Sequence, residues 1–173
     1  MLYEQIFKEF GKAVEESKNS RRDILLREAQ EQNIEGIIGT LNAHFASIPC
    51  RLYLSAKNEA FYQSNVFSFI DASSLEISSS LGYQDINLTV GKTTYVLEAK
   101  HNKSALEAIQ QGLEKKYIHN HLKNNRDVVL IGLNFVDNSR NIDDWQAIKY
   151  NQDGEVQQFW NIDGSPPSNI QLY

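Results

Sequence analysis

Two acidic residues and a lysine stand where neighbouring β-strands would bring them together. Asp85 begins one alternating segment, and Glu98 and Lys100 lie at the end of the next. In an antiparallel hairpin the start of one strand lies opposite the end of the other, so Asp85 can approach Glu98 although the two are distant in the chain. Because Glu98 and Lys100 are two residues apart, they point to the same face of the strand. The sequence therefore predicts a cluster of three polar side chains at one end of a sheet.

This set of residue types suits metal-dependent cleavage of a phosphodiester bond. Two carboxylates can hold Mg²⁺ or Mn²⁺ through oxygen ligands. Such a cation offsets charge on the phosphate and lowers the pKa of a bound water. The lysine can orient that water or stabilise developing negative charge. The alternative is an ordinary exposed Glu-x-Lys pair with Asp85 in a turn. We favour chemistry because Glu98 follows an apolar strand and precedes a long helical segment.

Helical patterns fill the part of the chain before this cluster. Apolar residues at three- and four-residue spacing predict helices over 2–14, 21–32 and 34–45, and Ile48-Pro49 ends the third. A further helix is expected from Ser55, with Glu59 near its start. These helices would brace one side of the cluster.

Short strands and one long helix make up the rest. Segments 75–78, 85–90 and 94–98 predict three consecutive antiparallel strands, and 103–123 predicts one long helix. Segment 128–135 is nearly all apolar, as in a strand buried on both faces. Segments 145–150 and 156–160 predict a hairpin around Asp153-Gly154. The tail around Gly164-Ser165-Pro166-Pro167 is expected to be irregular.

Length and composition are those of one globular, intracellular domain. The chain has 173 residues, 41% hydrophobic and 23% charged, with a single cysteine, Cys50, which we expect to be a small buried side chain. The N-terminus does not resemble a signal peptide, and no stretch approaches the roughly 18 apolar residues of a membrane span. We therefore expect a cytoplasmic protein that does not bind membranes.

The net charge of -5 counts against nucleic-acid binding through a broad basic surface, although metal at an acidic site would reverse the local field.

The segment from about Asn58 to Trp145 resembles the PD-(D/E)XK nuclease superfamily, in particular a subgroup attached to AAA-ATPase-like domains in bacterial proteins. The matching motifs are Asn58-Glu59-Ala60-Phe61-Tyr62, Gly82-Tyr83-Gln84-Asp85, Leu97-Glu98-Ala99-Lys100, 108–117, 130–135 and 140–145. The resemblance implies an α/β, restriction-endonuclease-like core of order αβββαβ with a mixed central sheet. With it we expect an N-terminal helical extension over 1–52, packed on a nuclease-like domain over 53–173.

The resemblance also implies roles for individual residues. Asp85 and Glu98 would bind the metal with Glu59 as a further acidic residue, and Lys100 would be the catalytic lysine. A glutamine and a tyrosine on the following helix would correspond to Gln111 and Tyr117, although Gln110 would share a helix face with Tyr117 more closely. The subgroup has arginine where this chain has Tyr83, which removes a cation and adds a ring that can stack on a base.

Four other features have structural explanations, and for the last of them contact with nucleic acid is equally open. Gly91-Lys92-Thr93 lacks the first glycine of a phosphate-binding loop and predicts a hairpin turn. His119 and His121 have no third ligand nearby in sequence and are expected to face solvent. Trp145 and Trp160 are expected to pack in the core, and Lys115, Lys116 and Lys123 can be explained equally as phosphate contacts or as a solvated helix face.

Two functions from different classes are compatible with the sequence. The first is a Mg²⁺- or Mn²⁺-dependent nuclease acting on DNA, with RNA left open. The second is an inactive or weakly active nuclease-like interaction module of a toxin, defence or effector system, which the acidic charge and Tyr83 favour. A role as part of a larger ATPase-linked protein, with an ATPase-like domain or protein as partner, is also left open, as is the oligomeric state.

Overall fold

The structure is a computed structural model in which residues 21–55, 58–71, 86–122, 124–137 and 139–161 are described. The expected helix over 2–14, the expected strand over 75–78 and the tail from Gly164 lie outside these residues. So does the segment Gly82-Tyr83-Gln84-Asp85, which carries one of the predicted metal ligands.

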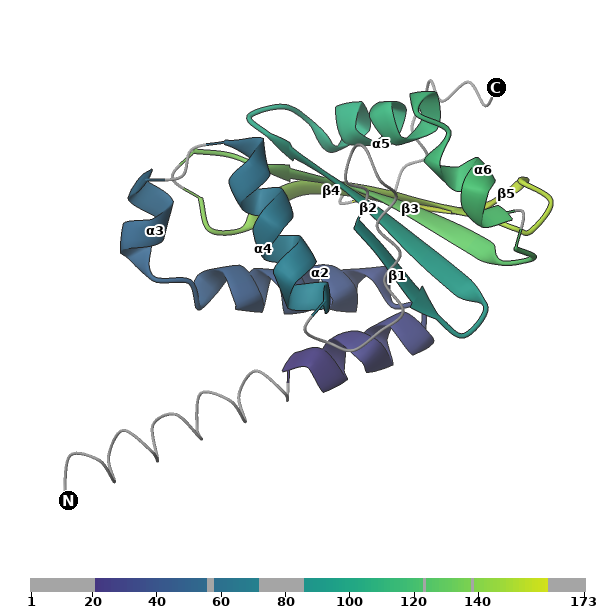
Figure 1. Ribbon diagram of the computed structural model, residues 1–173, viewed down its shortest axis with the longest axis horizontal. Coiled ribbons are helices and arrows are strands. Elements are labelled where there is room, and N and C mark those ends of the chain that lie inside the picture. The colour runs from purple at the N-terminus through teal and green to yellow at the C-terminus, as the bar shows by residue number, and fades with distance from the viewer. Residues whose placement is uncertain (1–20, 56–57, 72–85, 123, 138, 162–173) are drawn as a thin grey trace, which may run out of the picture.

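A five-stranded mixed sheet forms the centre of the molecule (Figure 1). The strands are β1 (Ile86–Val90), β2 (Thr93–His101), β3 (Asp127–Phe135), β4 (Ile142–Tyr150) and β5 (Val156–Asn161), and they lie in this order across the sheet. Strands β2 and β3 are parallel, and the other neighbouring pairs are antiparallel. The parallel pair needs a crossover connection, which the helices between β2 and β3 provide.

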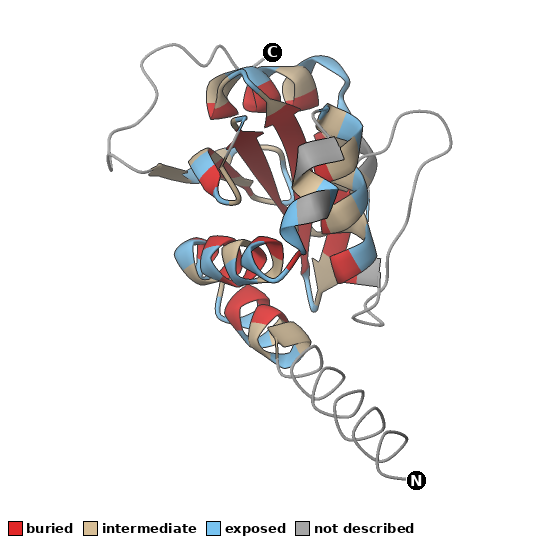
Figure 2. Cartoon of the chain, turned by 90° about the vertical axis from the view of Figure 1, so that its left-hand side faces the viewer, coloured by how far each residue is buried: buried red, intermediate tan, exposed pale blue. Residues whose placement is uncertain are grey.

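The two faces of the sheet carry separate hydrophobic cores. On β2, Tyr95 and Leu97 point into the core beneath the N-terminal helices, whereas Val96 points into the core beneath the crossover helices. Strand β3 is buried on both faces from Val128 onward, as its nearly continuous apolar run predicts. Figure 2 shows this burial concentrated in the central strands and on the helix faces that turn toward them.

Helices on the N-terminal side cover one face of the sheet. Residues 21–30 are helical, and α2 (Ile34–Ala46) and α4 (Glu59–Asp71) confirm the helices expected around Ile37 and Glu59. Their apolar faces share one core with the strands, made of Leu25, Ile34, Ile37, Leu41, Phe45, Tyr62, Val66, Ile70 and their neighbours. The layer that the sequence predicts beside Glu59 is therefore present among the described residues.

The chain after Pro49 differs from what the sequence predicts. A short helix, α3 (Cys50–Ser55), follows Pro49 and was not expected. Cys50, expected to be buried, is exposed at the start of α3, where its Sγ accepts a hydrogen bond from Arg140. Proline fits the first turn of a helix, so a helix-ending proline can also precede a new helix. The apolar pattern alone did not reveal that restart.

The crossover is two helices instead of the single long helix expected over 103–123. Helix α5 (Ala105–Glu114) ends at Lys115, Lys116 adopts a left-handed conformation with φ 56°, and α6 (Tyr117–Leu122) follows. Ser104 caps α5 by accepting from the backbone N–H of Glu107, and its hydroxyl contacts the Glu107 carboxylate. The three- and four-residue apolar spacing continues across the break, which is why the sequence indicated one helix.

The two expected hairpins and the expected packing of both tryptophans agree with the structure, whereas His121, expected to face solvent, is half-buried. Strands β1 and β2 form an antiparallel hairpin around Gly91, and β4 and β5 form a second around the turn that contains Asp153. Trp145 is buried and Trp160 packs against the same core. No helix among the described residues has the length and apolar character needed to cross a bilayer. The arrangement is an α/β fold of the restriction-endonuclease-like type with a mixed central sheet.

Candidate active site

Glu98 and Lys100 lie side by side near the end of β2 and point to the face that α5 covers. Both residues are only 3% exposed, and the Lys100 Nζ donates to Glu98 Oε1 at 3.0 Å. The same ammonium donates to Glu59 Oε1 at 2.9 Å. A buried ammonium thus holds two carboxylates that are 39 residues apart in the chain.

Glu59 reaches this position because of how α4 begins. The Asn58 side chain accepts from the backbone N–H of Phe61, which fixes the start of the helix and makes Glu59 its first residue. Helix α4 packs on the opposite face of the sheet from α5. Its first turn meets the edge of β2 beyond Leu97, the last residue of β2 that pairs with the described part of β1. Glu59 therefore approaches Lys100 across the edge of the strand.

Burial and the neighbouring charges shift the pKa values of Lys100 and Glu98 in opposite directions. Burial alone lowers the pKa of Lys100, but the hydrogen bonds to Glu59 and Glu98 and the charges of both carboxylates outweigh it and raise the pKa. Lys100 therefore stays protonated at neutral pH. Burial raises the pKa of the Glu98 carboxyl, and the hydrogen bond from Lys100 and the charges of Lys100 and Lys115 partly oppose that rise. The site combines a fixed positive charge with an acid whose ionisation depends on nearby cations.

Asp85 lies outside the described residues, so its distance from Glu98 is not given by the structure. Its neighbour Ile86 is the first residue of β1 and pairs with Leu97, the residue before Glu98. The hairpin register that the sequence predicts is therefore confirmed up to the position next to each carboxylate. The approach of Asp85 to Glu98 stays a prediction.

The glutamine and tyrosine predicted for one helix stand on two. Gln111 is half-buried on α5, Gln110 is exposed, and Tyr117 begins α6. Because the helix is broken between them, the sequence spacing does not decide whether Gln110 or Gln111 lies on the same side as Tyr117. Tyr117 packs against the core beneath α5 and α6, and the Lys115 Nζ lies 5.4 Å from the centre of its ring.

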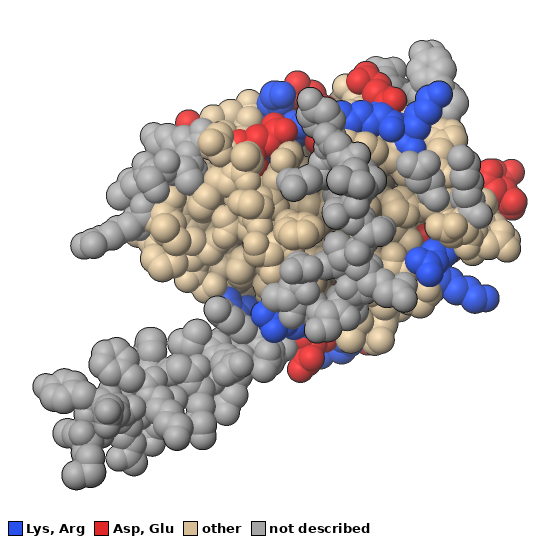
Figure 3. Space-filling view, in the orientation of Figure 1, with Lys and Arg blue, Asp and Glu red and all other residues tan. Residues whose placement is uncertain are grey.

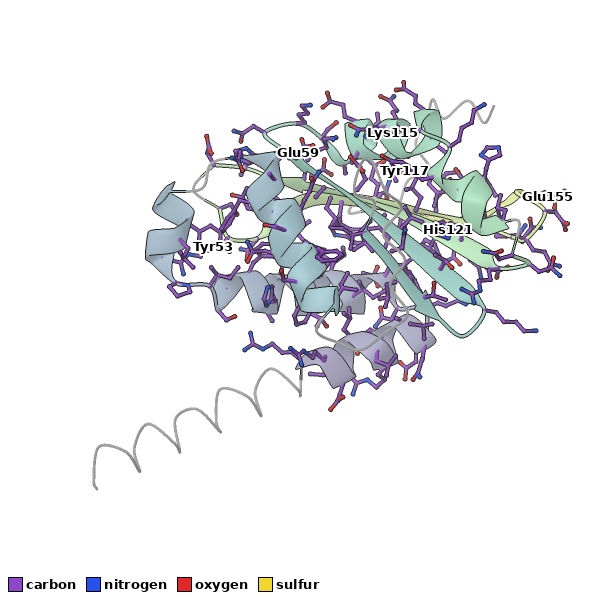
Figure 4. All side chains as sticks on the ribbon, in the orientation of Figure 1. Tyr53, Glu59, Lys115, Tyr117, His121 and Glu155 are labelled. Atoms are coloured by element: carbon purple, nitrogen blue, oxygen red, sulfur yellow. The ribbon has the colours of Figure 1, made fainter. Side chains whose placement is uncertain are left out.

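Two residues that the sequence did not single out for catalysis also lie at the site. Lys115, the C-cap of α5, lies close enough to Glu98 for its charge to lower the pKa of that carboxyl. Gln63, one turn after Glu59 on α4, donates to Glu59 Oε1 at 3.2 Å. Figure 4 shows Glu59 at the start of α4 and Lys115 at the α5–α6 junction, with Glu155 in the β4–β5 turn at the far end of the sheet. For Gln63, the only available signal was its four-residue spacing from Glu59.

Polar contacts also fix the start of α5 beside the cluster. Asn134, which pairs with Lys100 on β3, accepts a hydrogen bond from the backbone N–H of Lys103 through its side chain. The Asp144 side chain accepts from the backbone N–H of Ala105 at 2.7 Å. Because a carboxylate near a helix N-terminus is favourable, Asp144 stabilises the first turn of α5. The loop from β2 to α5 is therefore held by side chains from β3 and β4.

The donor set suits a hard divalent cation. Glu59 and Glu98 each bind Lys100 through Oε1, which leaves Oε2 of each carboxyl group as an oxygen that a cation can use. The described residues contain no group of three or more His, Cys, Asp or Glu side chains arranged to hold a metal, and Asp85 stands outside them. On the face shown in Figure 3, acidic and basic side chains lie near one another along the margins.

Comparison with protein-family models places residues 57–145, just over half of the chain, in a family described as "PD-(D/E)XK nuclease superfamily". Neither the comparison with curated proteins nor the comparison with solved structures gives a match. The matched span starts before Glu59, contains Glu98 and Lys100, and ends at Trp145 on β4. It thus contains the helix, the strands and the crossover that build the cluster. The chain belongs to the PD-(D/E)XK nuclease superfamily.

Proposed function

We propose that this protein is a divalent-metal-dependent nuclease that hydrolyses phosphodiester bonds in DNA. The observation that carries the proposal is the position of the Lys100 ammonium, within 3.0 Å of carboxylate oxygens from both Glu59 and Glu98. Carboxylates and an amine in contact are the groups that phosphate hydrolysis needs. Membership of a nuclease superfamily supports the same activity.

Asp85, Glu98 and Glu59 would hold the cation, which is Mg²⁺ or Mn²⁺ because all three offer hard oxygen ligands. When bound, the cation offsets charge on the phosphate and lowers the pKa of a water molecule. Lys100 stays protonated, so its ammonium stabilises negative charge that develops on the phosphate oxygens. Gln111 would help to orient the attacking water or the phosphate from α5. Tyr117 would act through Lys115, whose ammonium lies over its ring.

Cleavage by variants of the full chain tests this assignment. Labelled double-stranded DNA, single-stranded DNA and RNA would each be incubated with Mg²⁺, Mn²⁺ or Ca²⁺. We expect the wild-type protein to cut DNA with Mg²⁺ or Mn²⁺. Lys100→Gln should lower the rate by at least about 100-fold, since removing one charge-stabilising donor costs about that much in other hydrolases. Asp85→Asn should also lower the rate strongly, because it removes the charge of a proposed ligand of the cation.

The control is Glu155→Gln, which removes one exposed carboxylate at the β4–β5 turn, remote from Glu59 (Figure 4). It should cut as fast as the wild type after identical purification. Equal cleavage by folded Lys100→Gln or Asp85→Asn would show that the assigned residues do not perform the reaction, or that the activity comes from a contaminant.

A nuclease-like interaction module is the second candidate, favoured by the net charge of -5. Such a module has no reason to bind Mn²⁺ at the carboxylate cluster. Calorimetric titration of the wild type and of Glu98→Gln with Mn²⁺ separates the two candidates. A nuclease should bind the ion and lose affinity with the substitution, whereas a docking module should give no heat from either protein.

A further inference from the structure

Gln63 joins the helix that carries Glu59 to the strand that carries Glu98 and Lys100. Its side-chain Nε2 donates to Glu59 Oε1 at 3.2 Å and to the backbone carbonyl of Ala99 at 3.3 Å. Ala99 is the residue between Glu98 and Lys100. One amide group thus contacts both halves of the carboxylate cluster.

Glu59 needs such a contact more than Glu98 does. Glu98 is 3% exposed and packed within the sheet, whereas the Glu59 side chain is 33% exposed and stands on the first residue of a helix. A glutamate side chain loses rotamer entropy when it is fixed, so a half-exposed one needs contacts that offset this loss. Two donors on the same oxygen, Lys100 Nζ and Gln63 Nε2, restrict the Glu59 carboxyl group.

The bond to Ala99 acts on the backbone of the motif itself. The described part of β1 pairs with β2 only up to Leu97, so Ala99 lies on β2 beyond that pairing. There the side chain of Gln63 on α4 donates a hydrogen bond to the Ala99 carbonyl. The position of the Glu98–Lys100 segment relative to α4 is therefore set by a side chain.

We propose that Gln63 is a positioning residue that keeps the Glu59 carboxyl in register with Glu98 and Lys100 for binding a divalent cation. The inference rests on the proposed function. Glutamine suits the role because its amide donates two hydrogen bonds without charge. A glutamate in its place would repel Glu59, and a lysine would add a positive charge near the cation. Substitution of a residue that hydrogen-bonds to a metal ligand commonly changes metal affinity by about 10- to 100-fold.

Gln63→Met tests the proposal because methionine has a similar length and donates no hydrogen bond. We expect the dissociation constant for Mn²⁺, measured by calorimetry, to rise about tenfold. The kcat for DNA cleavage should fall while KM for DNA stays near the wild-type value, since the substitution does not alter a DNA-binding group. Ser64→Ala is the matched control: Ser64 is exposed on the same helix and its hydroxyl contacts only its own helix, at the Phe61 carbonyl. It should leave both quantities unchanged.

A readout in the metal-free protein does not depend on nuclease activity. The side-chain amide resonances of Gln63, assigned in the wild-type protein by triple-resonance NMR, should shift in Glu59→Ala and should not shift in Glu107→Ala, which alters an exposed acid on α5. Unmoved resonances in Glu59→Ala would overturn the proposal even if Gln63→Met failed to fold.

The failure of this inference can be told apart from failure of the proposed function. If the wild type binds Mn²⁺ and cuts DNA, and Gln63→Met does both equally well, Gln63 has no positioning role and the nuclease assignment stands. If the wild type neither binds Mn²⁺ nor cuts any substrate, the proposed function is wrong and the inference falls with it.

Discussion

At the scale of single residues, the buried Lys100–Glu98 ion pair carries a cost in folding free energy. Both side chains are almost inaccessible to water, and transfer of each charge from water into the protein is expensive. Packed apolar residues would serve stability as well or better at these positions. Function is the more direct explanation for an ion pair placed on the buried face of β2.

Lys100→Met should therefore destabilise the protein by about 3–5 kcal/mol, because it leaves the buried Glu98 carboxyl without its partner. Glu98→Met combined with Lys100→Met should cost clearly less than the sum of the two single substitutions. Urea unfolding of the three variants measures both quantities. For comparison, Lys149→Met removes a more exposed partner of Asp127 and should cost within about 1 kcal/mol. Additive costs at Glu98 and Lys100 would contradict the coupling.

His121 gives a second prediction, on pH. It is half-buried, contrary to the solvent-facing position expected from sequence, and burial together with the charge of Arg126 lowers its pKa. As the pH falls below about 6.5, the unfolded chain takes up a proton that the folded protein still excludes, so the free energy of unfolding falls. This contribution is absent well above that pH. His121→Gln should therefore flatten the decline between pH 7.5 and pH 5. An unchanged slope in His121→Gln would rule out His121 as its source.

The sequence located the side chains that a local pattern or motif identifies. It missed the side chains whose position depends on how one helix or strand packs against another. Strand alternation placed Glu98 and Lys100 on one face, and the family motif placed Glu59 on the helix that meets them. Nothing local to Gln63 indicates a bond to Ala99, because that contact depends on where α4 meets the edge of the sheet. Cys50 was placed wrongly because its exposure depends on α3, a helix that the apolar pattern did not predict.

At the scale of the elements, the close approach of α5 to β3 determines what surrounds Glu98. Gly132 pairs with Glu98, and a Cβ added to Gly132 would lie 2.5 Å from the carbonyl oxygen of Ala105. The start of α5 cannot move freely, because Asp144 holds the backbone N–H of Ala105. Helix α5 can therefore sit this close to the sheet only with glycine at position 132.

Gly132→Ala should destabilise the protein by about 1–3 kcal/mol through this overlap and should also slow cleavage, since α5 would shift beside Glu98. Gly39→Ala gives the opposite test. Gly39 is exposed within α2, and an added Cβ would meet no atom of the described chain within 4 Å. It should stabilise by about 0.4–1 kcal/mol by restricting the unfolded chain. Thermal unfolding of both variants measures the difference, and equal melting temperatures would contradict the packing argument.

The break between α5 and α6 is the element that sequence periodicity predicted wrongly. Leu113 before the break and Tyr117 after it both pack against the same core, so the apolar spacing continues although the helix does not. The left-handed residue is Lys116, and no glycine or proline marks the turn. Both helices pack on this core, so the apolar pattern records the packing and does not record the change of direction between them.

At the scale of the whole molecule, the helical part before α4 and the sheet behave as one packed body. Leu25, Leu41 and Phe45 share a continuous core with Leu97 and Ile131 of the central strands. We propose that the described part of the N-terminal extension, 21–52, is an integral layer of the nuclease-like domain and unfolds with it. The boundary near residue 52 then does not separate two folding units.

Leu41→Ala tests this cooperativity. Leu41 is fully buried, so its truncation should cost about 2–5 kcal/mol. Far-UV circular dichroism, which reports on the helices, and the fluorescence of Trp145 and Trp160 on the sheet should shift to lower urea together. Loss of helical signal before any change in tryptophan fluorescence would show that the extension unfolds separately.

The burial of Lys100 also makes this side chain resistant to amine-directed chemistry. Acylating and methylating reagents attack the neutral amine, whereas Lys100 is 3% exposed and its two carboxylate neighbours keep it protonated. Lys103, Lys115 and Lys116 are exposed and should react first. Reductive methylation of surface lysines, a common aid to crystallisation, should therefore leave the central amine unmodified, and mass spectrometry of the treated protein would show that peptide unlabelled at Lys100.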